Sequence, residues 1–195
     1  MKKILLATTV CASLILGGCN NREVTRVDPD KQVDLSGRWN DVDSRLVAEE
    51  LTKQILGERW LANFESENPG KKPTIICGFI ENKSHEHIEA ETFVKDIERS
   101  FINSGLVKLV QGGAKREEIR GERADQQTNA SKSTMKKFGL EMGADYMLQG
   151  SINSIVDSYK KDKVVFYKIN LELSHIQTNE VVWIGDKELK KLIKN

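Results

Sequence analysis

Residues 74–80 read Thr-Ile-Ile-Cys-Gly-Phe-Ile, an almost unbroken apolar run that follows the turn residues Gly70 and Pro73. A short apolar run bounded by turn residues is typical of a central strand that is buried on both faces of its sheet. The sequence therefore predicts that this strand lies at the middle of the fold, with helices covering the sheet on either side.

Helical periodicity flanks this run. Before it, Asp41 or Asp43 can cap a helix whose apolar positions are Leu46, Val47, Leu51, Ile55 and Leu56. A second short helical stretch around residues 60–64 follows Gly57. After the run, an apolar stripe predicts a helix over about 88–104 that ends at Gly105; its residues are Phe93, Ile97 and Phe101.

The middle of the chain is less apolar. We expect a short strand over 107–110, then a poorly buried helix and a loop over 111–134, in which Ile119 is almost the only apolar anchor. A further helix is expected from the spacing of Met135, Phe138 and Met142, with its end at Gly143.

The last third changes to a period of two, which indicates strands. Alternating apolar residues run from Tyr146 to Val156 and from Val165 to Leu173, and a third apolar segment covers 181–184. Turns at 160–163 and 178–180 separate these three segments. Three strands with short turns form an antiparallel meander. The predicted fold class is α/β: a single mixed sheet with a C-terminal antiparallel three-strand meander, flanked by helices.

The N-terminus begins with a positive charge and a short apolar core, as secretory signal peptides do. The core is shorter than the ~20 residues of a transmembrane helix. Its last residues, Leu16-Gly17-Gly18-Cys19, resemble the bacterial lipobox, which implies cleavage before Cys19 and lipidation of that residue. The alternative is an ordinary signal peptide that leaves Cys19 as a free thiol. We expect a lipoprotein signal peptide over 1–18, a flexible tether over 19–37 and a globular α/β domain over 38–195.

Composition limits the partners and the chemistry. The 195 residues carry a formal charge of +1, with 30% charged residues of both signs, and give no electrostatic case for nucleic-acid binding. The third cysteine, Cys77, lies within the apolar run at 74–80. It is therefore expected to be a small buried core residue, with a catalytic thiol as the alternative.

Several stretches together resemble the penicillin-binding protein activator family, the LpoB-type lipoproteins. The resemblance spans about residues 34–190, in the stretches 34–44, 70–74, 82–88, 91–99, 125–127, 143–146, 164–167 and 182–185. It implies a fold similar to the amino-terminal domain of TolB. It also implies a non-enzymatic lipoprotein of the outer membrane, facing the periplasm, that binds and activates a bifunctional class A penicillin-binding protein in peptidoglycan synthesis.

One feature departs from that family. Its best-known members carry a long, Pro-rich tether, whereas the segment here is short and holds only Pro29. An alternative function is a structural or secretion-related envelope lipoprotein of the CsgG type. Such a channel subunit needs membrane hairpins with lipid-facing apolar residues. The meander strands are candidates for these hairpins, although a core requires their apolar face to point inward.

No catalytic motif, phosphate loop or cofactor site is expected. His85 and His87, beside Glu81, Glu86 and Glu89, are the only residues of metal-ligand type that cluster, and a solvated loop explains them better than a metal site. Trp39 and Trp183 are expected to pack in the core or as a lid, with interface anchoring as the alternative. Candidate partner-binding residues are Arg38, Trp39, Asn40, Asp41 and Asp43, and the loop residues Asn82, Lys83, His85 and His87.

Overall fold

The computed structural model describes residues 23–28, 31–137 and 139–194. The predicted signal peptide and Cys19 lie outside these residues. The chain divides into two compact units, residues 1–32 and 33–195. The described part of the first unit contains no helix or strand. The second unit contains every element described below.

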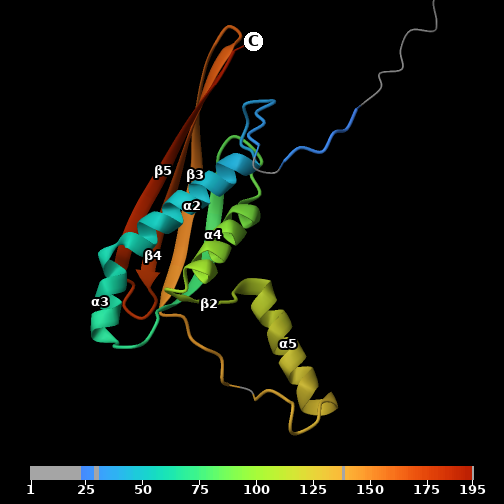
Figure 1. Cartoon of the computed structure of the whole chain (residues 1–195), viewed down its shortest axis with the longest axis vertical. Coiled ribbons are helices and arrows are strands. Elements are labelled where there is room, and N and C mark those ends of the chain that lie inside the picture. Colours follow the sequence, from blue (N-terminus) through green and yellow to red (C-terminus); the bar gives the residue numbers. More distant parts are fainter. Residues whose placement is uncertain (1–22, 29–30, 138, 195) are drawn as a thin grey trace, which may run out of the picture. The chain divides into compact units, whose positions relative to one another are not determined.

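The second unit is a mixed α/β structure (Figure 1). Its helices are α2 (Asp41–Gly57), α3 (Arg59–Glu67), α4 (Ala90–Ser104) and α5 (Gly113–Asn129). Its strands are β1 (Thr74–Lys83), β2 (Lys108–Val110), β3 (Tyr146–Tyr159), β4 (Asp162–His175) and β5 (Val181–Ile193). The strand order is β2-β1-β3-β4-β5, with β1 parallel to β2 and β3, and β3, β4 and β5 antiparallel. The predicted fold class is confirmed.

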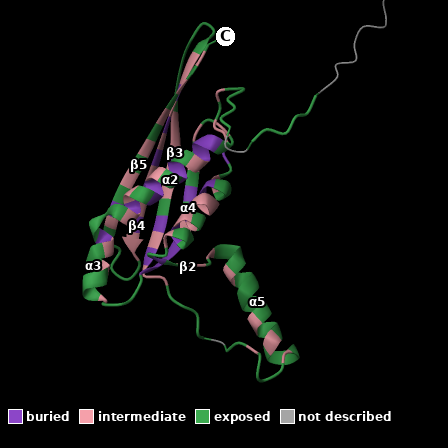
Figure 2. Cartoon of the chain, viewed as in Figure 1, coloured by how far each residue is buried: buried purple, intermediate pink, exposed green. Residues whose placement is uncertain are grey.

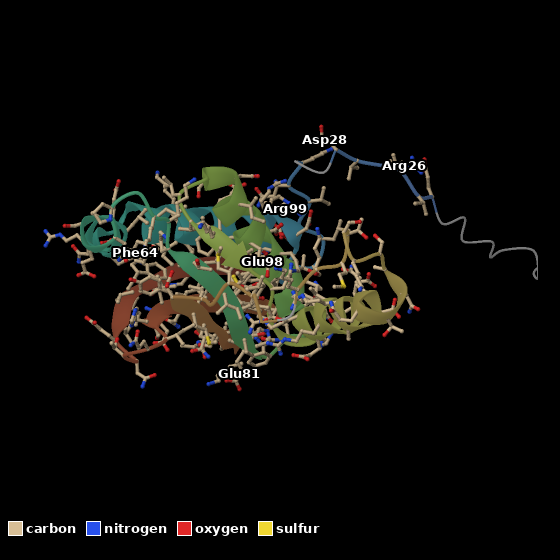
Figure 3. The ribbon with its side chains drawn as sticks, turned by 90° about the horizontal axis from the view of Figure 1, so that it is seen from below. Arg26, Asp28, Phe64, Glu81, Glu98 and Arg99 are labelled. Atoms are coloured by element: carbon tan, nitrogen blue, oxygen red, sulfur yellow. The ribbon has the colours of Figure 1, made fainter. Side chains whose placement is uncertain are left out.

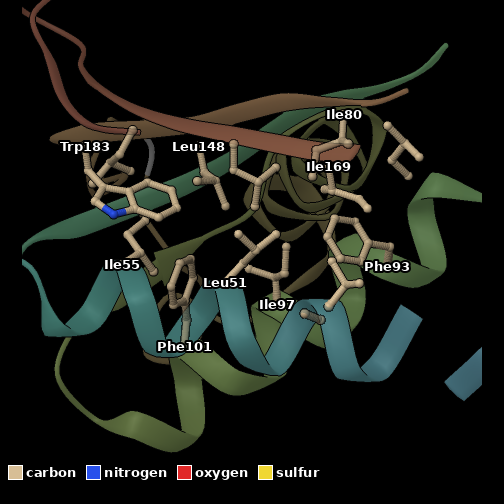
Figure 4. Close-up of a cluster of buried hydrophobic side chains, with 14 of the residues drawn as sticks. Leu51, Ile55, Ile80, Phe93, Ile97, Phe101, Leu148, Ile169 and Trp183 are labelled. Carbon is tan, nitrogen blue, oxygen red and sulfur yellow. The ribbon is translucent and has the colours of Figure 1, made fainter. Parts of the chain in front are cut away.

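The core lies between the sheet and two helices on the same side of it. α2 and α4 pack against each other and against the strands. Figure 4 shows Leu51 and Ile55 of α2 and the aromatic rings of α4 pointing at Leu148, Ile169 and Trp183 of the sheet. Trp183 is buried, as expected for core packing.

The opposite side of the sheet, which we call the open face, is covered by none of the helices that the described residues form. In Figure 3 Glu81 points to this side, away from α4. The prediction that residues 74–80 are buried on both faces is therefore wrong for the second half of the run. A β-bulge between Cys77 and Ile80 shifts the register, so that Ile80 remains in the core while Phe79 is 75% exposed.

β2 is short and pairs only with the first residues of β1, which are Thr74, Ile75 and Ile76. From Cys77 to Lys83 the outer edge of β1 has no strand partner among the described residues. The chain leaves this edge at residues 111–113 and continues into α5, none of whose residues is buried (Figure 2).

The predicted helix over Met135 to Gly143 is absent from the described residues of that segment, which form turns and irregular structure. Gly139 adopts a φ of +73°, a left-handed conformation that ends helical hydrogen bonding. Met142 instead accepts a hydrogen bond at its sulfur from the Thr74 hydroxyl, 3.4 Å away. We call α5 together with residues 130–142 the arm.

The meander is longer than predicted, since β5 runs to Ile193 rather than ending at residue 184. β1 ends where Lys83 pairs with Asn153, and β3 continues beyond it. The strands therefore extend past the rest of the sheet as a three-stranded ribbon (Figure 1), which comprises residues 154–159, 162–167 and 189–193. Lys160, with a φ of +54°, makes the tight turn at its tip.

Candidate functional site

Two stretches of the predicted contact region meet at the base of the ribbon. The backbone N–H of Trp39 donates to Oε2 of Glu86 at 3.0 Å. The ring of Tyr167 on β4 lies between the two stretches: its centroid is 5.4 Å from that of Trp39 and 6.2 Å from that of His85. Residues 38–41 and 82–87, grouped around Tyr167, form what we call the junction surface.

The start of α2 fixes the first stretch. Asn40 and Asp43 form a reciprocal capping box, in which each side chain accepts a hydrogen bond from the backbone N–H of the other. The indole of Trp39 donates to the Ser44 hydroxyl at 2.7 Å. The position of Trp39 is thus set by the helix that follows it.

A partly buried ion-pair cluster attaches this stretch to β5. Nζ of Lys191 lies 2.5 Å from a carboxylate oxygen of Asp43 and 2.8 Å from one of Asp34, and it also donates to the carbonyl of Arg38. Burial lowers the pKa of Lys191, but the hydrogen bonds to Asp34 and Asp43 outweigh it and raise the pKa overall. Lys191 therefore stays charged and holds the segment against the ribbon.

The second stretch is a loop closed by its own side chains. The amide of Asn82 donates to the carbonyl of Glu86, and the hydroxyl of Ser84 donates to the side-chain oxygen of Asn82. The backbone N–H of His85 donates to the hydroxyl of Ser154 on β3. This loop is therefore held in one shape, as a preformed contact surface requires.

A carboxylate and a phenol are buried at the centre. The Glu86 side chain is only 9% exposed, and its Oε1 lies 3.2 Å from Nε2 of His85. The hydroxyl of Tyr167 makes no well-formed hydrogen bond within the described part of the chain. Burial, followed by the adjacent Glu86 carboxylate, raises the pKa of Tyr167. The phenol is thus neutral at any physiological pH.

The predicted contact residues fall into two groups. Asn40, Asp43 and Asn82 make the internal hydrogen bonds described above, and Trp39 is half-buried. The residues that face solvent are Arg38, Asp41, Lys83, His85 and His87. The structure brings both stretches together, and their contact with a partner remains a prediction.

Four residues at this site were missed from the sequence: Glu86, Ser154, Tyr167 and Lys191. Tyr167 and Lys191 occupy ordinary alternating strand positions, and only the register of β4 and β5 places them beside the N-terminal segment. From the sequence, Glu86 is a candidate only as a metal ligand. The sequence contained no signal for their role, because each contact joins residues far apart in the chain.

The other sequence candidates offer no catalytic arrangement. Within the described residues, no group of three or more His, Cys, Asp or Glu side chains is placed to hold a metal ion. His87 pairs with Glu89 at the surface, and Gly112 and Gly113 begin α5. Burial raises the pKa of the Cys77 thiol to about 12, so it is not a thiolate at neutral pH.

A crevice of about 410 Å³ lies at the other end of the sheet, near α3. Trp60, Tyr146 and His175 line it, and Nδ1 of His175 lies 2.9 Å from the Thr178 hydroxyl, within the β4–β5 turn. The bond between His175 and Thr178 stabilises the β4–β5 turn, and we do not interpret it as a catalytic pair of base and nucleophile. None of the helices in the described ranges is long and apolar enough to cross a bilayer.

A family model described as peptidoglycan-synthase activator LpoB matches residues 43–189. No protein in a search of the curated proteins matches this chain. Among solved structures, the LpoB C-terminal domain from Salmonella enterica is similar at 16% identity and a TM-score of 0.43, covering 75% of this chain and 98% of that one.

Two further solved structures are similar. The NMR structure of E. coli LpoB matches at 16% identity and a TM-score of 0.42, covering 89% of this chain and 81% of that one. Lipoprotein GNA1162 from Neisseria meningitidis matches at 12% identity and a TM-score of 0.40, covering 63% and 85% respectively.

Proposed function

The chain belongs to the peptidoglycan-synthase activator LpoB family, and on that premise we propose that it binds a bifunctional class A penicillin-binding protein and raises its activity. The match over residues 43–189 carries this proposal. A family defined by activating a synthase is regulatory, so the chain is not itself an enzyme.

Activation by binding has a simple energetic requirement. A bound protein raises a synthase's rate only if it binds the active conformation of the synthase more tightly than the inactive one. The difference between these two binding free energies sets how far the synthase shifts to its active conformation. The junction surface suits this role because its loop and its N-terminal segment are already held by internal hydrogen bonds. A preformed surface loses little conformational entropy on binding.

We place the synthase on the junction surface. Trp39 and His85 supply aromatic surface beside Tyr167, and interface hot spots are rich in such residues. Arg38, Lys83 and His87 surround them as an exposed polar rim. A rim of this kind affects association rate and orientation more than affinity.

The proposed function includes a lipid anchor at the N-terminus. We infer that Cys19 is acylated and that the chain is held at the outer membrane, facing the periplasm. Support comes from the lipobox-like residues 16–19. Two or three acyl chains give stable anchoring. Replacing Cys19 by Ala should therefore release the chain from the membrane fraction, whereas a variant that still pellets after a high-salt wash would contradict lipidation.

The decisive experiment is glycan polymerisation on lipid II by the organism's own class A synthase, with increasing amounts of the full-length protein. We expect a saturable rise in rate. Lys83→Glu should raise the protein concentration that gives half of the maximal rate, because reversing a rim charge slows association without touching the core. Arg59→Glu is the matched control: Arg59 is also exposed and begins α3, at the other end of α2 (Figure 1).

No rate change at saturating protein, together with no detectable binding, would refute activation. If both variants weaken the response equally, or if neither weakens it, the synthase does not bind at the junction surface. Activation itself would still stand. Both variants should unfold at the wild-type temperature.

A further inference from the structure

The open face of the ribbon carries a cluster of large apolar side chains. Cross-strand pairing places Ile155 beside Phe166 and Val164 beside Leu192, with Tyr159 at the tip. Ile155 is 67% exposed, Leu192 60% and Tyr159 74%. We call these five residues the ribbon patch. Contiguous exposed apolar patches usually mark binding surfaces.

Val165 and Tyr167, which alternate with the patch residues on β4, are fully buried on the other face. The predicted apolar face of the meander therefore points inward, and the patch is a second apolar surface that the alternation did not predict. A core therefore does not account for the patch.

Lysines surround the patch. Nζ of Lys190 lies 5.9 Å from the ring centroid of Phe166, and Nζ of Lys160 lies 5.3 Å from that of Tyr159. Residues 157–163 and 189–194 together contain six lysines and two aspartates. Both aspartates lie on the open face, where Asp157 pairs with Val164 and Asp162 with Tyr159. Lys191 is held on the opposite face by Asp34 and Asp43. The ribbon end thus combines exposed apolar side chains with an excess of lysines over aspartates.

The N-terminal segment joins the domain at the same end. Gly37 packs so closely on Ile193, at the end of β5, that a Cβ at this glycine would clash with the isoleucine Cγ1. Lys191 also holds Asp34. Fourteen residue steps separate Cys19 from Val33, and a chain of that length spans at most about 50 Å when extended. An anchor at Cys19 therefore keeps the ribbon end within reach of the membrane.

We propose that the ribbon patch docks on the anionic phospholipid surface of the membrane that holds the anchor. Its lysines match phosphate headgroups and its apolar side chains match the boundary of the acyl region. A second copy of the chain is a poorer occupant, because two ribbon ends with the same net positive charge would repel each other. Docking depends on the proposed anchor only for proximity to the membrane.

Docking leaves the synthase its own surface. The open face carries the patch, whereas the junction surface lies around Tyr167, whose side chain points to the other face. The two contacts can therefore be made at once, with the ribbon between lipid and partner.

The test uses tryptophan quenching by brominated lipids, which requires direct contact. Full-length protein carrying Tyr159→Trp is mixed with vesicles of phosphatidylcholine alone, or of phosphatidylcholine with phosphatidylglycerol. Ile184→Trp is the matched control, because Ile184 is 70% exposed at the other end of β5 and pairs with Glu172. The wild-type chain gives the background from its native tryptophans.

We expect quenching at position 159 only with phosphatidylglycerol, none at position 184, and loss of quenching in high salt. Adding Lys190→Gln should lower the docking equilibrium about fivefold, since one lysine near an anionic surface contributes about that factor. An unchanged unfolding temperature shows that the variant is folded.

Flotation in high salt separates the anchor from the patch. A chain that floats in high salt but shows no quenching at position 159 at low salt overturns the docking proposal and leaves the anchor standing. Quenching at position 159 without high-salt flotation supports docking and refutes the anchor. Docking is also overturned by equal quenching at both positions, or by burial of the introduced indole that depends on protein concentration and not on lipid.

Discussion

Helices α4 and α5 are similar in length, yet only one is part of the core. α4 buries Phe93, Ile97 and Phe101, one apolar residue per turn. α5 has no buried residue, and its stripe is reduced to Ile119, which is 46% exposed. Burial of an apolar stripe, and not the length of the helix, therefore decides which of the two packs into this core.

Polar contacts hold α5 in place of a core. Arg120 makes a bidentate pair with Glu141, with both N–O distances at 3.0 Å, and Arg123 adds a third bond to the same carboxylate at 2.9 Å. Lys115 pairs with Glu91 of α4. Exposed ion pairs of this kind contribute little to stability. The arm should therefore open without unfolding the rest of the domain.

The largest loss of stability is expected at Phe101 of α4. Replacing this fully buried ring by Ala should lower the free energy of unfolding by about 3–5 kcal/mol, because it removes apolar burial and leaves a cavity. Ile119→Ala on α5 is the control and should change it by less than about 0.5 kcal/mol. Urea denaturation measures both. Equal losses would mean that α5 belongs to the core.

A glycine pair gives the next largest effect. A Cβ at Gly150 on β3 would clash with the carbonyl oxygen of Asn170, so Gly150→Ala forces the strands apart. We expect a loss of about 2 kcal/mol or more. At Gly121 in α5 a Cβ meets nothing within 4 Å, and Gly121→Ala should stabilise that helix. Thermal unfolding that ranks the two variants the other way would contradict this packing.

Helix capping gives a smaller contrast. α2 begins with a capping box, whereas Gly112 caps α5 without a side-chain bond. Asn40→Ala should cost about 1 kcal/mol, since the N–H of Asp43 loses its acceptor. Asn40→Ser keeps an acceptor and should retain most of the stability. If chemical denaturation finds both variants equally destabilised, the cap is not the cause.

The smallest global effect is expected from the clamp on the arm. Hydrogen bonds from Arg120 and then Arg123 lower the pKa of Glu141 from 4.5 to about 2. A lowered pKa stabilises the folded arm above pH 4.5, and this contribution is lost as the pH falls towards 2. The protection of the amides across residues 113–129, measured as their exchange rate relative to the intrinsic rate at each pH, should therefore fall in acid before that of the core.

Glu141→Gln should accelerate the same exchange at neutral pH and leave the unfolding temperature almost unchanged. Glu117→Gln is its control, because Glu117 contacts only one of the two arginines. Unaltered protection of α5 in Glu141→Gln would show that the clamp does not hold the arm.

Local pattern predicted the helices and the meander well, because periodicity reports which side chains face a core. The stripe of Phe93, Ile97 and Phe101 and the alternation of Tyr146, Leu148 and Ile152 both fall on the buried face. The same reasoning failed at residues 135–143, where the spacing of the methionines resembles a helix but Gly139 turns the chain. Burial of Phe79 was predicted wrongly, because a β-bulge turns its side chain to the open face. A bulge depends on pairing with a distant strand, which local pattern does not report.

The sequence singles out both stretches of the junction surface as candidate contacts, and their contact with a partner remains a prediction. It does not single out Tyr167 and Lys191, which join the two stretches. Strand register decides which side chains reach a surface, and the sequence gives no direct measure of it. The ribbon patch was hidden for the same reason, since alternating apolar residues at Ile155 and Val165 point to opposite faces.

The strand order also determines how the chain can fold. β3, β4 and β5 are joined by short turns, so their pairing needs only local loop closure. β1 must instead pair with β3 across the whole α4–arm segment, bringing Ile75 beside Tyr146. Non-local parallel pairing is slow, because the entropy of closing a long loop is lost before contacts compensate for it. The meander should therefore form first, and docking of β1 and its helices should limit the rate of refolding.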